Sequence, residues 1–224
     1  MDTAVSLVES YLRMNGYFTV TEFSVQHADE KQPGHYATAT DLDVLAIRLP
    51  WTAEDPLSVP TGNGGERCAI LLAGDPALGM DQQLPDVLIG EVKEGAAELN
   101  KRLLTPQVLH TVFRRIGCAP GEYVADAVST LLRRGEVTAR PSRGLACRVR
   151  LASFCGFVDE PPDPAVVVIT LDHVLQFIRE RLDACRAVLQ SAQFKDPSLA
   201  MLKLMEKLNI GMMFKEPGHS TSRA

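Results

Sequence analysis

Two apolar runs of strand length, residues 42–49 and 86–92, lie in the first half of this 224-residue chain. Their length and their content of aliphatic side chains predict strands with at least one buried face. An amphipathic helix is predicted before them, over residues 3–14, and helical patterns follow them. Because helix, strands and further helices succeed one another, we expect an α/β fold with a central mixed sheet flanked by helices.

The rest of the chain supplies further elements and few strong boundaries. Residues 50–67 are rich in Pro and Gly and predict a loop. We expect one domain over residues 1–192, then a C-terminal helix and a disordered tail within residues 193–224. Other strands are predicted over residues 17–25, 68–73, 145–157 and 165–170, and other helices over residues 94–116, 121–134, 171–190 and from 196 onward.

Composition narrows the class of protein. Hydrophobic residues make up 46% of the chain, which is enough to bury a full core, yet no run approaches the roughly 18 apolar residues of a membrane span. The N-terminus lacks the basic and apolar segments of a signal peptide. Five cysteines without a Cys-x-x-Cys pair predict buried thiols in a reducing compartment and disfavour zinc. We therefore expect a cytoplasmic protein with no membrane partner.

Charge is unevenly distributed along the chain. The net charge of −5 argues against indiscriminate binding to nucleic acid, because such binding depends on neutralising phosphates. Between residues 133 and 150, however, the sequence contains six arginines and only one acidic residue, Glu136. Arg140, Arg143 and Arg148 are candidate phosphate contacts within this basic segment. A solvated surface patch explains the same residues equally well.

Four ionisable residues occupy positions that otherwise predict burial. Glu9 lies within the apolar stripe of the first helix, and Asp43 shares one side of its strand with aliphatic residues. Glu91 and Lys93 share one side of the next strand in the same way. Converging buried carboxylates repel one another unless a cation joins them, and oxygen ligands suit Mg²⁺ or Mn²⁺. Asp41 competes with Asp43 as the ligand, because it points to the same side two residues earlier.

These residues resemble the signature of the PD-(D/E)XK phosphodiesterase superfamily, which has the restriction-endonuclease-like fold. The resemblance rests on Gly16-Tyr17 after the first helix, on Asp41-Leu42-Asp43 and on Glu91-Val92-Lys93. It covers about residues 5–95, and it departs from the family in the long insertion between Asp43 and Glu91. The fold that it implies has an αβββαβ core with extra C-terminal helices.

The resemblance also implies an activity, the Mg²⁺- or Mn²⁺-dependent hydrolysis of phosphodiester bonds in DNA. Asp43 and Glu91 would be metal ligands, with the carbonyl of Val92 as a third. Lys93 would be the catalytic lysine that stabilises charge on the phosphate. Glu9 would support the attacking water or a second ion. On this reading, Glu9, Asp43, Glu91 and Lys93 gather in one pocket.

Other functions fit parts of the same sequence. Some members of the superfamily have lost activity, so a catalytically inactive module that binds nucleic acid or a protein partner is the alternative. Residues 105–150 also have the helix, helix and hairpin outline of a winged helix, although packing against the core explains that outline as well. Methionines in the C-terminal helices predict contacts through which the protein could form a homo-oligomer.

Overall fold

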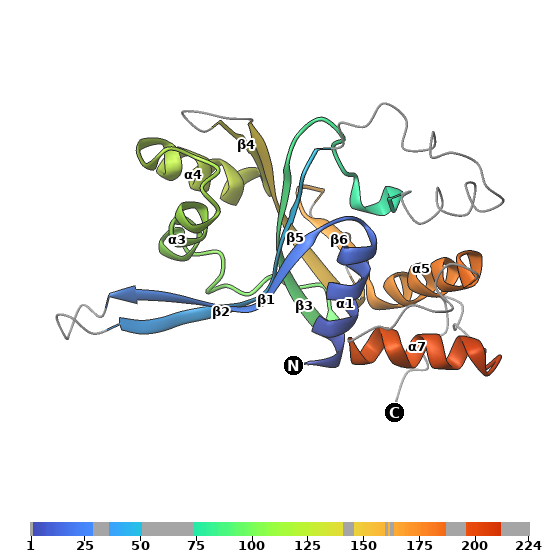
Figure 1. Ribbon diagram of the computed structural model, residues 1–224. Helices are drawn as coiled ribbons and strands as arrows, with labels where there is room; N and C mark the ends of the chain where they lie inside the picture. The colour runs from blue at the N-terminus through green and yellow to red at the C-terminus, as the bar shows by residue number, and fades with distance from the viewer. Residues whose placement is uncertain are drawn as a thin grey trace.

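A computed structural model describes residues 2–28, 36–50, 74–140, 146–159, 161, 164–186 and 196–211. Within this part of the chain, strands form a six-stranded sheet and helices cover both of its faces (Figure 1). The strands are β1 (Phe18–Ala28), β2 (Tyr36–Arg48), β3 (Asp86–Ala96), β4 (Glu136–Ala139), β5 (Cys147–Phe157) and β6 (Val167–Thr170). The helices are α1 (Thr3–Met14), α3 (Pro106–Ile116), α4 (Val124–Arg134), α5 (Leu171–Ala184) and α7 (Pro197–Lys207), with short 3₁₀ turns η1 (Pro76–Leu78) and η2 (Gly121–Tyr123).

The sheet is mixed, as the sequence predicts. Its order is β1-β2-β3-β5-β4. Strand β4 pairs with the first part of β5, and β6 pairs with a later part of β5 on the same side. Strands β1, β2 and β3 pair antiparallel, whereas β3 and β5 run parallel. A parallel pair requires a long crossover, and here α3 and α4 supply it. The expected α/β class with a mixed sheet flanked by helices is therefore confirmed.

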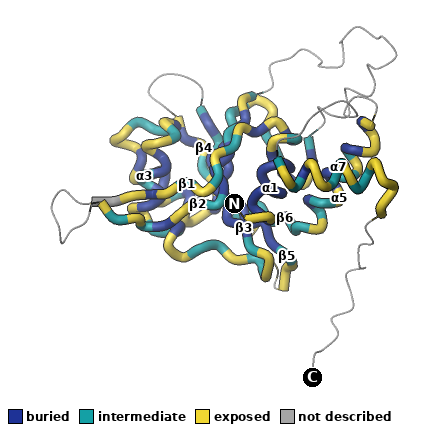
Figure 2. The backbone as a smooth tube through the Cα atoms, turned by 60° about the horizontal axis from the view of Figure 1, so that its bottom comes forward, coloured by how far each residue is buried: buried dark blue, intermediate teal, exposed yellow. Residues whose placement is uncertain are grey.

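Two hydrophobic layers form because successive side chains of a strand point to opposite faces. On one face, α1, α5 and α7 pack over residues such as Val44, Leu88 and Phe154. On the other face, α3 and α4 pack over residues such as Ile89 and Leu151. Figure 2 shows the buried tube at the centre and exposed segments along the helices and the β1–β2 hairpin. Burying each large aliphatic side chain contributes about 1.5–3 kcal/mol, so these two layers dominate stability.

Local signals explain where the first helix begins and ends. The side chain of Asp2 accepts a hydrogen bond from the Ala4 N–H at 2.7 Å, which satisfies one free donor of the first turn. Gly16 follows the helix with φ of 83°, a left-handed conformation that favours glycine. The turn brings Tyr17 back over the core, where its ring is buried.

Several predicted boundaries are wrong. Strand β3 continues to Ala96, where pairing with Phe157 of β5 persists, so the helix expected from residue 94 begins only at Pro106. Strand β2 starts at Tyr36, before the strand predicted over residues 42–49, and β4 was not among the predicted strands. In each case pairing with a distant strand overrides the local pattern. The predicted loop of residues 50–67, apart from residue 50, the strand of 68–73 and the disordered tail lie outside the described residues.

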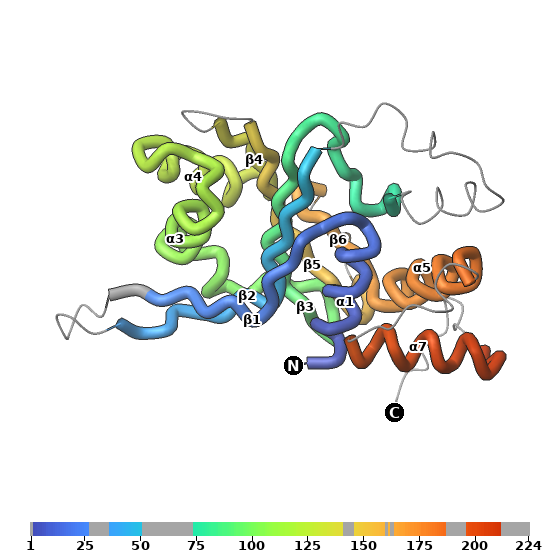
Figure 3. Tube along the Cα trace, viewed as in Figure 1, coloured from blue at the N-terminus to red at the C-terminus, as the bar shows by residue number. Residues whose placement is uncertain are grey.

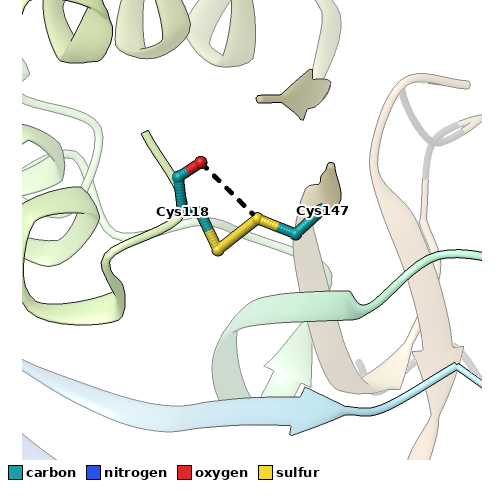
Figure 4. The surroundings of a disulfide bond; sticks show 2 residues. All are labelled: Cys118 and Cys147. Carbon is teal, nitrogen blue, oxygen red and sulfur yellow. Dashed lines mark hydrogen bonds between the residues drawn. A yellow bond between two sulfur atoms is a disulfide. The ribbon is translucent and has the colours of Figure 1, made fainter. Parts of the chain in front are cut away.

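Two cysteines contradict the prediction of free thiols. Cys118, after α3, and Cys147, at the start of β5, form a disulfide with a Cα–Cα distance of 6.1 Å (Figure 4). The Cys147 sulfur also lies 3.8 Å from the Cys118 carbonyl oxygen. The two cysteines are 29 residues apart, and this spacing does not predict a disulfide. They come together only because β4 and β5 return to the sheet. Cys155 and Cys185 are buried, as predicted.

Helix α7 packs against α1 and α5. Asp196 caps it by accepting from the Leu199 N–H at 2.8 Å, and the Ser6 hydroxyl of α1 donates to the same carboxylate at 2.7 Å. Its outer face exposes Met201 and Leu204, so self-association through this helix stays a prediction. Among the described residues, none of the helices combines the length and apolar character that a membrane crossing requires.

Candidate functional site

A polar pocket of about 440 Å³ opens where β2 and β3 stop pairing. Backbone pairing between these strands ends at Val44 and Gly90, one residue before Asp43 and Glu91. Beyond that point the space between the strands is lined by side chains from β2, from β3 and from the turn before α3. Its polar lining residues are Thr38, Thr40, Asp41, Asp43, Glu91, Lys93, Asn100 and Arg102.

Asp43 joins the two strands at this point. One of its carboxylate oxygens accepts a hydrogen bond from the Val92 backbone N–H at 2.8 Å. Asp41 lies on the same wall, but it is exposed and bonded to the hydroxyl of Ser24 on β1. This difference favours Asp43 over Asp41 as the ligand that would act together with Glu91.

Glu91 and Lys93 form an ion pair inside the pocket, with 2.7 Å between Oε1 and Nζ. They are two residues apart on a strand, so both point to the face covered by α3 and α4. The Glu91 side chain is 2% exposed and that of Lys93 is 43% exposed, so the ammonium reaches solvent while the carboxylate does not.

Burial and charge act in opposite directions on this pair. Burial raises the pKa of Glu91, the nearby Asp43 charge raises it further, and Lys93 only partly offsets both. The hydrogen bond to Glu91 raises the pKa of Lys93, which keeps that side chain charged. A carboxylate whose charge is disfavoured in this way is stabilised by an additional cation.

Two buried side-chain atoms have no hydrogen-bond partner in the described part of the chain, Glu91 Oε2 and Ser153 Oγ. Glu91 and Ser153 are register partners in the parallel β3–β5 ladder, so the two side chains are neighbours on one face of the sheet. A buried polar atom without a partner costs about 1–3 kcal/mol. The residues present therefore fit an oxygen-coordinated cation or water beside Glu91.

Sequence reasoning assigned no role to Ser153. Its strand is predicted correctly, but the parallel register that places it beside Glu91 is set by α3, α4 and the rest of the crossover. No short motif around Ser153 carries that information. Only a reliable prediction of strand pairing would have identified it.

Glu9 does not line this pocket, contrary to the expected gathering of four residues. It is buried on α1, where Oε1 accepts from the Arg13 guanidinium at 2.7 Å and from the Thr19 hydroxyl at 3.0 Å. Arg13 lies one turn later on the same helix, which makes this pair geometrically favourable. Moreover, α1 packs on the sheet face opposite to that of Glu91. Three of the four predicted residues thus come together and Glu9 does not.

The donor set is therefore small. No group of three or more His, Cys, Asp or Glu side chains is arranged to hold a metal among the described residues. Asp43 on β2 and Glu91 on β3 both line the pocket, and the Val92 backbone contacts Asp43. Such a set suits Mg²⁺, which commonly takes one or two carboxylates together with substrate phosphate and water.

The basic segment of residues 133–150 is less available than its sequence suggests. Arg148 bonds to Glu136 at 3.0 Å and to the Gly79 carbonyl at 2.8 Å. Arg150 is 2% exposed and bonds through Nε to buried Asp86 at 2.9 Å. Both side chains point toward the loop that contains η1. Arg150 is internal, whereas the Arg148 side chain is 25% exposed and its guanidinium is already bonded. Arg140 is exposed at the end of β4, and Arg143 lies outside the described residues.

The winged-helix outline is present in the order of elements but not as a separate unit. Helices α3 and α4 are followed by β4 and β5, which pair antiparallel. However, β5 also pairs with β3 along its length and with β6, so it lies inside the main sheet. These elements therefore belong to the same core as the polar pocket.

Comparisons with known proteins add no assignment. No known protein family, no curated protein and no solved structure matches the chain. The function is therefore inferred from the pocket itself, which combines the carboxylates of Asp41, Asp43 and Glu91 with the Lys93 ammonium. Beside it, Glu91 Oε2 and Ser153 Oγ are buried without partners among the described residues.

Proposed function

We propose that this protein is a metal-dependent nuclease of the PD-(D/E)XK type that hydrolyses phosphodiester bonds in DNA. The observation that supports it best is the convergence of Asp43, Glu91 and Lys93 in one polar pocket, with a buried oxygen of Glu91 left without a partner. The order α1, β1, β2, β3, two helices and a strand parallel to β3 is consistent with the αβββαβ core that the resemblance implies.

Asp43 and Glu91 would hold a Mg²⁺ or Mn²⁺ ion, with the Val92 carbonyl as a further oxygen ligand. A divalent cation supplies a Lewis acid for the negative charge that develops on phosphate. The hydrogen bond from the Val92 N–H orients Asp43, so its second oxygen is free to bind. The Ser153 hydroxyl lies beside Glu91 without a partner among the described residues, so a water bridging the two would orient that carboxylate.

Lys93 supplies the positive charge on the open side of the pocket. Its ammonium reaches solvent and is held by Glu91, so it can donate to a non-bridging oxygen of a phosphate that enters there. Because the pKa of Lys93 is raised, the side chain stays protonated and acts as a charge rather than as a base. Stabilisation of this kind typically accounts for a factor of about 10²–10³ in rate.

The test is cleavage of labelled single-stranded, duplex and branched DNA, with matched RNA, in the presence of Mg²⁺ or Mn²⁺. The parent protein should cleave at least one DNA substrate and should lose cleavage on chelation. Asp43→Ala serves as the inactive control, and exposed Asp41→Ala as the matched control that should retain most of the rate. Failure of the parent to cleave any substrate with either ion would contradict the proposal.

One observation favours the catalytically inactive alternative, a nuclease-like module that binds nucleic acid or a protein partner. Glu9 is neutralised by Arg13, so the pocket has fewer carboxylates than the resemblance implies. Calorimetric titration with Mg²⁺ and Mn²⁺ separates the two functions. Metal binding that Asp43→Ala and Glu91→Gln each remove supports the enzyme, whereas no binding supports the inactive module.

A further inference from the structure

A second pocket, of about 470 Å³, adjoins the polar pocket. It lies between the β1–β2 hairpin, which contributes Val25 and Ala39, and the start of α3, which contributes Arg102, Thr105 and Val108. We call these residues the α3 cleft. Ala39 and Arg102 line both pockets, so the two lie next to each other. Figure 3 shows the hairpin extending away from the sheet beneath α3.

The segment that forms this side of the molecule is strongly basic. Residues 99–121 contain Lys101, Arg102, Arg114 and Arg115 and no Asp or Glu, in a chain whose net charge is −5. All four side chains are exposed. None of them forms an ion pair within the part of the chain that the structure describes. Since uncompensated cations on one side of an acidic protein attract anions, this charge points to a polyanionic ligand.

The basic side chains lie near the two ends of α3, two of them before its first residue and two in its last turn. Arg102 lies at the mouth of the polar pocket, and Arg114 and Arg115 lie in the last turn of the helix. The Arg115 guanidinium carbon lies 6.0 Å from the ring centroid of Phe23 on β1, so the far end of the helix also faces the hairpin. Positive charge therefore lies at both ends of α3, and the end with Arg102 adjoins the candidate metal site.

We propose that the α3 cleft binds one strand of nucleic acid and leads it into the pocket of Asp43, Glu91 and Lys93. Arg102 would contact the phosphate next to the one in that pocket, and Arg114 and Arg115 would contact phosphates farther along. Only the direction of the strand toward the pocket rests on the proposed nuclease function. Binding along α3 stands on the cleft and its charge.

The lining of the cleft favours a single strand over a duplex. Val25 and Val108, both nearly fully buried, form an apolar floor beside half-buried Ala39, and an unpaired base that packs against this floor leaves water. A duplex keeps its bases stacked and offers mainly phosphates to such a surface. The polar rim from Arg102 and Thr105 then lies where a sugar and phosphate would follow the base.

Binding can be measured without cleavage, by fluorescence anisotropy in EDTA. The probe is a labelled single-stranded oligodeoxynucleotide of about 12 nucleotides, a length in the range that single-strand-binding domains cover. Arg102→Gln and Arg114→Gln should each weaken binding about five- to tenfold and lower the slope of log affinity against log salt by about 0.7. Lys207→Gln is the matched control, because Lys207 is exposed on α7 across the sheet, and it should leave affinity unchanged.

Specific outcomes would overturn the proposal. They are no binding of the strand by the parent protein, equal weakening by Lys207→Gln, or affinity for the matching duplex that equals or exceeds that for the single strand. The two proposals also fail separately. Intact binding without cleavage in either Mg²⁺ or Mn²⁺ supports the cleft and contradicts the nuclease, whereas cleavage with an unaltered rate and affinity in Arg102→Gln contradicts the cleft alone.

Discussion

The Asp43 carboxylate of β2 accepts the backbone N–H of Val92 on β3, at 2.8 Å, at the point where the two strands cease to pair. A side chain thus takes the place of a strand partner. The same carboxylate lines the pocket that Glu91 and Lys93 also line. Asp43 thus has a structural role, the hydrogen bond from Val92, and a proposed chemical role as a metal ligand. Substitutions of Asp43 can separate the two roles.

Asp43→Asn should keep the hydrogen bond from Val92 while removing the negative charge. We expect unfolding free energy close to that of the parent, together with loss of metal binding and cleavage. Asp43→Ala should also lose metal binding and cleavage. In addition it removes the hydrogen bond, so the unpaired Val92 N–H should lower the free energy of unfolding by about 1–2 kcal/mol. Urea unfolding and calorimetric metal titration of the two variants check this, and tight Mg²⁺ binding by Asp43→Asn would contradict the ligand assignment.

Lys93→Ala should lower the cleavage rate by about 10²–10³ without unfolding the protein, because its ammonium reaches solvent and faces the proposed phosphate position. The rate is measured at saturating metal, so that weaker metal binding does not mimic the effect. Lys93→Arg keeps the charge and should recover part of the rate. If purified Lys93→Ala cuts as fast as the parent, Lys93 has no catalytic role.

Glu91 should make stability depend on both pH and metal. Its pKa is raised in the folded state, chiefly by burial, so folding favours the protonated form. Its stabilising contribution is therefore full below its unfolded pKa and is lost as pH rises through the folded pKa. At neutral pH without metal, Glu91→Gln should be at least as stable as the parent. Added Mg²⁺ should raise the melting temperature of the parent only, and an equal rise in Glu91→Gln would refute the site.

Asp75 should carry an opposite pH dependence on the α1 face of the sheet. Its buried carboxylate accepts from the Tyr11 hydroxyl at 2.8 Å and lies 2.7 Å from His173 Nε2. Although burial alone would raise its pKa, the hydrogen bonds from Ala77, His173 and Tyr11 bring the pKa below its ordinary value. The stability that it contributes is present above its unfolded pKa of about 4 and is lost as pH falls through the folded pKa.

Asp75→Asn should therefore reduce stability at neutral pH and make stability less sensitive to acid below about pH 4. Urea unfolding across this range measures both effects. His173→Gln, which retains a hydrogen-bond donor near Asp75, is the matched control for loss of the imidazole. An unchanged acid dependence in Asp75→Asn would exclude this carboxylate as the titrating group.

Reduction of the Cys118–Cys147 disulfide should lower the free energy of unfolding. Its closed loop spans 29 residues, for which the chain-entropy estimate is about 3–4 kcal/mol. Urea unfolding with and without reductant measures the change. The double variant Cys118→Ser, Cys147→Ser should resemble the reduced parent and should not respond to reductant. A parent whose unfolding is the same in both conditions would contradict a stabilising disulfide.

Local pattern in the sequence determined the class of fold and the faces of the key strands. Side chains on a strand alternate with a period of two, so the placement of Asp43, Glu91 and Lys93 beside buried aliphatic residues follows from spacing alone. The helix spacing of α1 likewise placed Glu9 on a buried face. These statements need only backbone geometry, which is the same in every protein.

Tertiary structure decided which of these groups meet. Glu9 lies away from the polar pocket because α1 packs on the other side of the sheet, and Ser153 lies beside Glu91 because β5 pairs with β3 in one particular register. Arg150 is internal because Asp86 is buried beside it. Register and packing depend on the sum of many distant contacts, and a local pattern contains no information about that sum.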